Sequence, residues 1–178
     1  LEIVPNSDRS TWFGSYVGPL LYREVSGNFV IETLVSAEDF NYPMSPPPND
    51  YTSAGLIAVD PNNVYDSFAV VVGTHQDSAD YGPETKWTND GTTTVNACNT
   101  QDFELRVRIC RVGDARRGYY YSQSDAGWCE ALNGSNNPAR ISGLLPDTVW
   151  IGNIAQHYPR LPSSILRARF DYTTGTTD

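Results

Sequence analysis

Two neighbouring stretches of the chain place arginine and tyrosine side chains where they could bind a ligand. Residues 103–112 alternate apolar and polar, so Arg106 and Arg108 share one face, and Tyr119 and Tyr121 follow after a Gly-Asp turn. If this turn is of type II′, the two arginines lie opposite the two tyrosines across an antiparallel hairpin. Sugar-binding sites combine aromatic rings with nearby hydrogen-bonding groups, so the pattern predicts a binding surface. The alternative is that the arginines stack on the tyrosines only as packing.

Three more aromatic residues lie in or beside polar loops, where a ring has little reason to belong to the core. They are Tyr81, Trp87 and Trp128. An exposed indole gains most of its value when a partner covers it, so we predict that these rings also contribute to binding. The candidate ligand-binding residues are therefore Trp87, Trp128, Tyr81, Tyr119, Tyr121 and Arg108.

The sequence offers no motif for catalysis. No glycine-rich phosphate loop follows a predicted strand, and the run GSYVG at 14–18 does not match the GxSxG elbow of hydrolases. The two histidines, His75 and His157, lack the spacing of a zinc protease, and we expect each to be a surface loop residue. We therefore predict no catalytic residues.

Length and composition limit the number of domains and the classes of partner that the protein could bind. The chain suits a single domain over 1–178, with a polar arm at 1–11 and a linker-like tail at 173–178. The formal net charge of −9 argues against nucleic acid, because phosphate contacts need a basic face. The longest purely apolar run, 68–72, is too short to span a membrane. No signal peptide is visible, so a secreted protein would be present here in mature or excised form.

Short alternating segments separated by Gly, Asn, Asp and Pro predict an antiparallel β-sandwich of about ten or eleven strands without helices. The stretch 19–36 predicts a hairpin about a Ser-Gly turn, with Arg23 diagonal to Glu32 as a cross-strand ion pair. The last strand, 164–172, is expected to direct Tyr172 toward the core.

Several of these segments resemble a known protein superfamily. The run GPLLYREVSGNFVIETLV, the strand SAGLIAVD and the closing ARFDYT resemble bacterial extracellular domains of the concanavalin A-like lectin/glucanase superfamily, and the DUF1349-like group in particular. The resemblance covers the chain from Trp12 to Tyr172. It implies an all-β, antiparallel jelly-roll β-sandwich and an extracellular, often sugar-related setting, but it implies no activity.

Glycoside hydrolysis needs two carboxylates that face one cleft, and the jelly-roll glucanases usually place them two or four residues apart on one strand. In this chain Glu104 stands among arginines and Glu32 stands alone. The adjacent pair Glu38-Asp39 points to opposite faces if extended. We therefore predict that the protein is not an enzyme, and a glycoside hydrolase is the least favoured function.

The resemblance also implies a structural calcium ion, because sandwiches of this superfamily often carry one. Asp171 lies where the resembling domains end in a similar FD, so it is the candidate ligand. The alternative is an ion pair of Asp171 with Arg167 or Arg169. No other cofactor is predicted.

The three cysteines are Cys98, Cys110 and Cys129. In the register of the predicted hairpin, Cys98 is level with Cys129 and Cys110 faces Arg117, which favours a Cys98–Cys129 disulfide in an oxidising compartment. The alternative is three reduced thiols. A glycosylation sequon stands at 133–135.

Two functions remain in contention. The favoured one is a non-catalytic extracellular or cell-surface module that binds glycan or cell-surface polysaccharide and acts in adhesion. The alternative is a structural subunit that assembles with its own copies into a filament or surface layer, holding the polar arm and tail in place.

Overall fold

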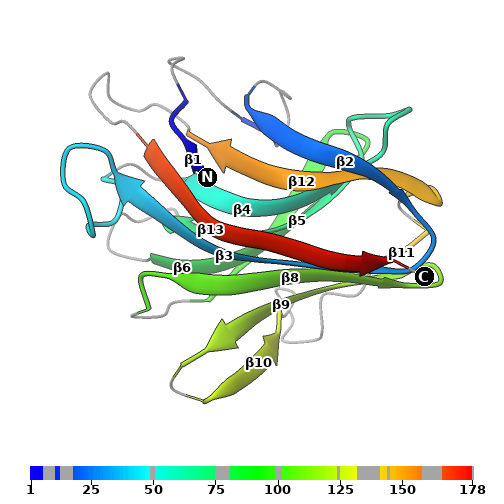
Figure 1. Ribbon diagram of the computed structural model, residues 1–178. Helices are drawn as coiled ribbons and strands as arrows, with labels where there is room; N and C mark the ends of the chain where they lie inside the picture. Colours follow the sequence, from blue (N-terminus) through cyan, green and yellow to red (C-terminus); the bar gives the residue numbers. More distant parts are fainter. Residues whose placement is uncertain are drawn as a thin grey trace.

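The computed structural model describes residues 1–5, 11–12, 18–48, 51–74, 81–98, 102–123, 125–131, 141–143, 145–157 and 166–177. These residues form a jelly-roll β-sandwich of two antiparallel sheets, as predicted, and none of them is helical (Figure 1). Within these ranges no helix could cross a membrane.

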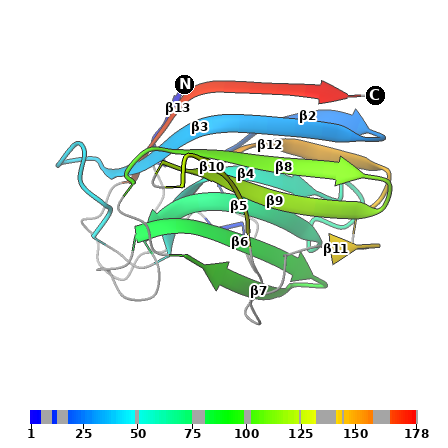
Figure 2. The ribbon, with the colours of Figure 1, turned by 90° about the horizontal axis from the view of Figure 1, so that it is seen from below.

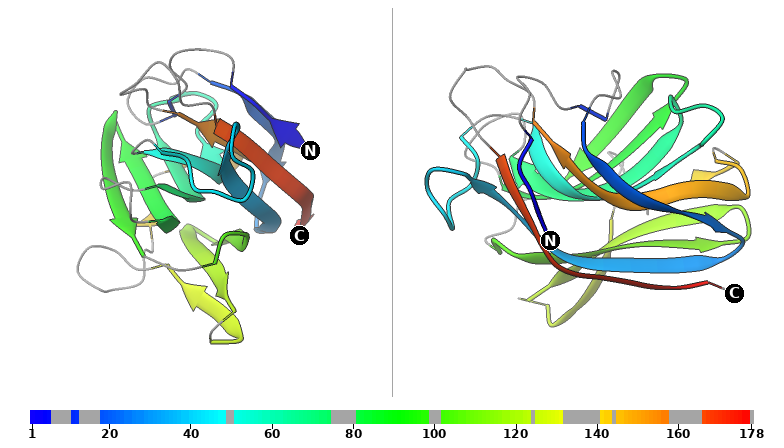
Figure 3. Two further views of the ribbon diagram at one scale, coloured as in Figure 1. Left: turned by 90° about the vertical axis from the view of Figure 1, so that its left-hand side faces the viewer. Right: turned by 45° about the horizontal axis from the view of Figure 1, so that its top comes forward.

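The first sheet, called here the β3–β8 sheet, has the strand order β1 (Glu2–Ile3), β13 (Leu166–Thr177), β3 (Phe29–Asp39), β8 (Leu105–Val112), β9 (Ala115–Ser122) and β10 (Gly127–Glu130). A short strand, β11 (Ile141–Ser142), also pairs with β9. The second, the β4–β5 sheet, has the order β2 (Leu20–Ser26), β12 (Thr148–Gln156), β4 (Thr52–Val59), β5 (Ser67–Thr74), β6 (Tyr81–Asn89) and β7 (Thr92–Ala97). Figure 3 shows the two layers from one side and with the top of the molecule tilted forward.

The predicted hairpin of residues 19–36 is wrong, because its two strands belong to different sheets. Gly27 has a φ of 75°, as a tight turn requires, but the turn leads from β2, which pairs with β12, to β3, which pairs with β13 and β8. Arg23 and Glu32 therefore cannot form the predicted cross-strand pair. Crossing between layers lets Val25 and Phe29, which are 5% and 2% exposed, enter the core from opposite sheets.

The inner faces of the two sheets form one apolar core. Strand alternation places Ile31 on β3 and Val107 on β8 toward Leu56 and Val70 of the opposite sheet, and all four are buried. A second apolar layer covers the outer face of the β4–β5 sheet and contains Trp12, Ile57, Val59, Ala69, Val71 and Ile154. Strands β4 and β5 are thus buried on both faces, which explains their continuous apolar sequences.

The same outer face of the β4–β5 sheet holds a buried ion pair. Lys86 Nζ lies 2.6 Å from Glu84 Oε2, and the two side chains are 2% and 1% exposed. Their strand positions are opposite Ala69 and Val71, so the pair borders the second apolar layer. The only lysine of the chain is therefore not available at the surface.

A β-bulge in β13 changes which face its last residues occupy. Phe170 pairs with Val35 but Thr173 pairs with Thr33, so β13 contains one extra residue between them. The bulge turns Tyr172 outward, where it is 36% exposed, so the prediction that Tyr172 faces the core is wrong. Thr173 points inward instead and lies 3.1 Å from the Thr33 hydroxyl.

Both ends of the described chain are part of the β3–β8 sheet. Residues 173–177, predicted to be a linker-like tail, continue β13 and pair with β3 as far as Phe29. At the other end, β1 pairs with β13, and the Leu1 ammonium donates to the Phe170 carbonyl at 2.8 Å. Only the middle of the predicted polar arm, 6–10, lies outside the described residues.

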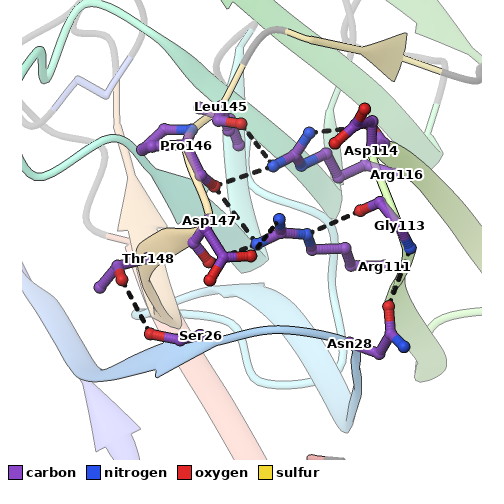
Figure 4. Close-up of polar contacts among 10 residues, drawn as sticks. All are labelled: Ser26, Asn28, Arg111, Gly113, Asp114, Arg116, Leu145, Pro146, Asp147 and Thr148. Carbon is purple, nitrogen blue, oxygen red and sulfur yellow. Dashed lines mark hydrogen bonds and ion pairs between the residues drawn. The ribbon is translucent and has the colours of Figure 1, made fainter.

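Two buried arginines connect the sheets at the β8–β9 turn (Figure 4). Arg116 is 1% exposed and lies opposite Arg111, which is 4% exposed. Arg116 donates hydrogen bonds to the carbonyl oxygens of Leu145 at 2.5 Å, Pro146 at 3.0 Å and Asp114 at 2.9 Å. Burial, together with the charge of Arg111, lowers the pKa of Arg116.

Arg111 holds the same segment from the neighbouring strand. It donates to the carbonyl of Pro146 at 3.3 Å, to the carbonyl of Asp147, and to the Asp147 carboxylate at 2.7 Å. It also closes its own turn through a 2.9 Å bond to the Gly113 carbonyl. Residues 145–147 lead directly into β12 of the other sheet. Arg111 and Arg116 therefore hold the start of β12 beside the β8–β9 turn.

We predict that Arg116→Met lowers the free energy of unfolding by about 2–4 kcal/mol, because buried carbonyls lose their donors while the volume is kept. The matched control is Arg117→Met on the same strand, where the side chain is 40% exposed and 3.9 Å from Glu130. That change should cost less than about 1 kcal/mol. Urea unfolding of both variants measures the difference, and equal losses would contradict the assignment.

Candidate functional site

A row of polar and aromatic side chains crosses the outer face of the β3–β8 sheet. Because Leu105, Val107 and Ile109 are buried, Arg106 and Arg108 must point outward from β8. We call the row the surface ladder; it runs over five strands and contains Tyr172, Glu32, Arg108, Trp128, Tyr121 and Arg106.

The β13–β3–β8 end of the ladder is polar. Arg108 Nη2 lies 2.6 Å and Arg108 Nε lies 3.2 Å from Glu32 Oε2, while the Tyr172 hydroxyl donates to Glu32 Oε1 at 2.7 Å. Burial alone would raise the pKa of Glu32, but the hydrogen bonds from Tyr172 and Arg108 and the charges of Arg108 and Arg106 lower it. Burial and the bond to Glu32 raise the pKa of Tyr172. Glu32 is therefore held as a carboxylate.

The other end of the ladder is aromatic. The Arg108 guanidinium carbon lies 3.8 Å from the centroid of the Trp128 ring, and that of Arg106 lies 4.0 Å from the centroid of the Tyr121 ring. Trp128 meets Tyr121 edge to face, with centroids 5.7 Å apart. The predicted register is confirmed at Arg108, which pairs with Tyr119. Arginine stacking, the packing alternative, is thus present at Tyr121, while Arg108 stacks on Trp128.

A pocket of about 320 Å³ lies at the aromatic end of the ladder. Its lining comprises Leu34, Glu104, Arg106, Tyr121, Gln123 and Ala126. Arg106 and Tyr121 belong to both the ladder and the pocket. A carboxylate, a guanidinium and an amide therefore converge beside an aromatic ring, which is the composition expected of a site for a small polar ligand.

Two predicted ligand-binding residues belong to the core instead. Tyr81 is 8% exposed, its hydroxyl bonds to backbone groups of Ala37 and Phe103, and burial raises its pKa. The expectation of an exposed loop is wrong because β6 already begins at Tyr81. Trp87 lies opposite Phe68 and packs against the core, so it is not an exposed platform.

The cysteines adopt another arrangement than the predicted one. Cys110 lies opposite Arg117, as predicted, but Cys129 pairs with Tyr120 and Cys98 follows β7 in the other sheet. The predicted level position is wrong because the β8–β9 ladder ends at Val107 and Tyr120. All three cysteines are free thiols in the structure.

Cys98 and Cys129 nevertheless both lie beside the hydroxyl group of Tyr120. Burial, followed by the charges and hydrogen bonds of these two thiols, raises the pKa of Tyr120. Burial and a 3.6 Å contact with Asp125 raise the pKa of Cys129, and burial raises the pKa of Cys110. The two thiols that were predicted to bond thus gather around Tyr120 from opposite sheets.

The predicted calcium ligand, Asp171, is exposed on β13. The described residues contain no group of three or more His, Cys, Asp or Glu side chains that could hold a metal ion. The two arginines proposed as its alternative partners have other carboxylates, since Arg167 lies 3.6 Å from Glu2 and Arg169 lies 3.4 Å from Glu38.

His157 is buried at 5% exposure, so the expectation of a surface histidine is wrong there. His75 and the sequon at 133–135 lie outside the described residues.

Comparison with known proteins shows the fold alone. No family model and no curated protein matches the chain. A protein of unknown function from Saccharomyces cerevisiae has a similar structure, with a TM-score of 0.74 at 12% identity, over 99% of this chain and 87% of that one.

Two enzymes contain the same fold. A xylan β-1,4-xylosidase from Bacillus halodurans matches with a TM-score of 0.67 at 15% identity, over 94% of this chain but 31% of its own. An alginate lyase from Zobellia galactanivorans matches with a TM-score of 0.53 at 13% identity, over 88% of this chain and 65% of its own. These neighbours share the jelly-roll β-sandwich fold with this chain. The chain spans less than a third of the xylosidase.

The lowered pKa of Glu32 gives a prediction with a definite sign. Its carboxylate stabilises the fold above its unfolded pKa, near the ordinary value of 4.5, and this contribution is lost as the pH falls through the lower folded pKa. Glu32→Gln should therefore reduce the free energy of unfolding by a constant amount near pH 7, and the difference from the unmodified protein should shrink below about pH 4.5. Urea unfolding at a series of pH values measures this, and a difference that persists to about pH 2 would contradict it.

Proposed function

We propose that the protein is a non-catalytic glycan-binding module whose ligand lies on the surface ladder and in the adjoining pocket. The observation that carries this proposal is the convergence of Arg106, Tyr121, Glu104 and Gln123 around about 320 Å³ of space. A sugar ring presents apolar CH faces surrounded by hydroxyl groups, so an aromatic ring beside charged and amide groups matches both of its surfaces.

The electrostatics of the ladder do not suit Glu32 to the role of the acid in sugar cleavage. Sugar cleavage requires a carboxylic acid whose pKa is raised so that it can protonate the leaving oxygen. Glu32 has the opposite shift, because Tyr172 and Arg108 stabilise its ionised form. The geometry supports an ordered surface that presents fixed hydrogen-bonding groups.

The match to part of a xylosidase supports a sugar-related setting, and it includes less than a third of that enzyme. We propose an extracellular or cell-surface location, which the sequence resemblance implies. The narrower assignment to the DUF1349-like group stays a prediction.

Substitution of Trp128 and of Trp87 distinguishes a tryptophan of the binding site from a tryptophan that packs on the core. Trp128→Ala should abolish binding to the polysaccharide that the protein recognises, while the loss of its arginine contact costs about 1 kcal/mol of stability. Trp87→Ala should cost about 2–3 kcal/mol, since that ring packs on the core, and the folded fraction should still bind. Affinity electrophoresis in gels containing xylan, β-glucan or alginate measures binding, and thermal unfolding measures stability.

The matched surface comparison is Tyr121→Ala with Tyr42→Ala, because Tyr42 is 68% exposed, lies in the loop after β3 and belongs neither to the surface ladder nor to the lining of the pocket. Only the first change should weaken binding. Retention by none of a broad glycan panel, or equal retention of Trp128→Ala and the unmodified protein, would refute the proposal.

An oxidising location also permits a Cys98–Cys129 disulfide, formed by exchange with an oxidised thiol compound that is reduced in turn. We propose this bond for the secreted protein because both thiols contact Tyr120. Mass mapping of non-reduced protein treated with oxidised glutathione should yield one linked peptide pair, 98 with 129. A link that contains Cys110 would show that the pairing is different.

A further inference from the structure

One arginine on the outer face of the β3–β8 sheet differs from the others in its pairing. Figure 2 shows four strands of this sheet, β13, β3, β8 and β9, running side by side. Among the described arginines that point outward from this sheet, only Arg106 forms no ion pair. The others are paired with carboxylates: Arg108 with Glu32, Arg117 with Glu130, Arg167 with Glu2 and Arg169 with Glu38.

The other polar neighbours of Arg106 do not neutralise its charge. It bonds to the uncharged hydroxyl group of Tyr172. The charge of Glu32 reaches Arg106 as well, but its carboxylate is already bound by Arg108. Glu104 lines the same pocket as Arg106 and forms no ion pair with it. A guanidinium group beside a pocket of about 320 Å³ is therefore available to an anion.

Stacking holds the Arg106 guanidinium in place. Its central carbon lies 4.0 Å from the centroid of the Tyr121 ring and 5.5 Å from that of the Trp128 ring. A stacked guanidinium keeps the N–H groups at its edge free and in one fixed plane. A planar anion can therefore accept two parallel hydrogen bonds from Arg106 while the side chain loses little further freedom.

We propose that the pocket binds a uronic acid unit of an acidic polysaccharide, with the sugar carboxylate on Arg106. This inference rests on the proposed glycan-binding function and names the class of sugar. A hexuronate is a sugar ring whose planar carboxylate matches the fork of an arginine side chain. Its hydroxyl groups can donate to Glu104 and exchange hydrogen bonds with the amide of Gln123.

Glu104 disfavours ligands that are anionic on every side. Its carboxylate accepts hydrogen bonds and repels a second negative charge, so the pocket suits a ligand with an acidic group at one end and hydroxyl groups at the other. The net charge of −9 likewise disfavours a nonspecific attraction to polyanions. Retention of an acidic polysaccharide would therefore report a specific contact.

Affinity electrophoresis in gels that contain alginate, polygalacturonate or hyaluronate tests the proposal. Each polymer is also used after chemical reduction of its carboxylates to alcohols, which keeps the sugar ring and the linkage but removes the charge. The unmodified protein should bind at least one acidic polymer and should bind its reduced form about 10- to 100-fold more weakly, because a charge-assisted bidentate bond is lost.

Two variants assign the contact to Arg106. Arg106→Gln should bind the acidic polymer about as weakly as the reduced one, so that the losses from the two changes do not add. The matched control, Arg117→Gln, removes an arginine of the same face that is already paired, and it should bind like the unmodified protein. Thermal unfolding checks that both variants fold, and the comparison of acidic with reduced polymer needs no variant.

Several outcomes would overturn the uronate assignment and leave the glycan-binding function standing. They are equal binding of the acidic and reduced polymers, retention by neutral xylan or β-glucan alone, and a preference for dextran sulfate, whose anionic groups are tetrahedral. An Arg106→Gln variant that still distinguishes acidic from reduced polymer as well as the unmodified protein does would also overturn it. Retention by no polysaccharide would refute the proposed function itself, and this inference with it.

Discussion

The mutual burial of two apolar sheet faces is the constraint on which the rest of the structure depends. Val25 and Phe29 are separated by three residues, yet they enter the core from opposite layers. This crossing makes β3 a central strand between β13 and β8. Once Ile31 and Val107 face inward, alternation fixes the outward direction of Glu32 and Arg108. The polar surface is thus a consequence of the core.

Order in the surface ladder comes from charge that is neutralised locally. Glu32 accepts from Arg108 and Tyr172, and Arg108 in turn lies over Trp128. Long side chains that are held in this way lose little further freedom when a ligand binds, so a preorganised surface favours affinity. The aromatic end opens into a pocket, which is why the proposed ligand is placed around Arg106 and Tyr121.

Strand positions followed from the sequence because alternation and turn chemistry are local signals. The type I′ turn at Asp90-Gly91 has φ values of 48° and 78°, and the β8–β9 register agrees with the one inferred from its turn. The same reasoning failed at residues 19–36, since a tight turn does not show whether the chain stays in one sheet. It also failed at Tyr172, because a bulge leaves no clear mark in the sequence.

The binding surface was predicted only in part for the same reason. Arg108, Tyr121 and Trp128 share a face through local register. Glu32 joins them through pairing between strands that are 76 residues apart, and such non-local pairing is not visible in a single sequence. Tyr81 was misjudged because it begins a strand directly after a polar stretch.

The most direct test of the account is a nuclear magnetic resonance titration with an oligosaccharide of whichever polysaccharide the protein retains. We predict that the Trp128 indole, the Arg106 side chain and the Tyr121 ring shift together in saturable fashion, while Lys86 on the buried face of the other sheet does not. Shifts that gather around Lys86 and Glu84, or cleavage of the oligosaccharide during the titration, would contradict a non-catalytic site on the β3–β8 sheet.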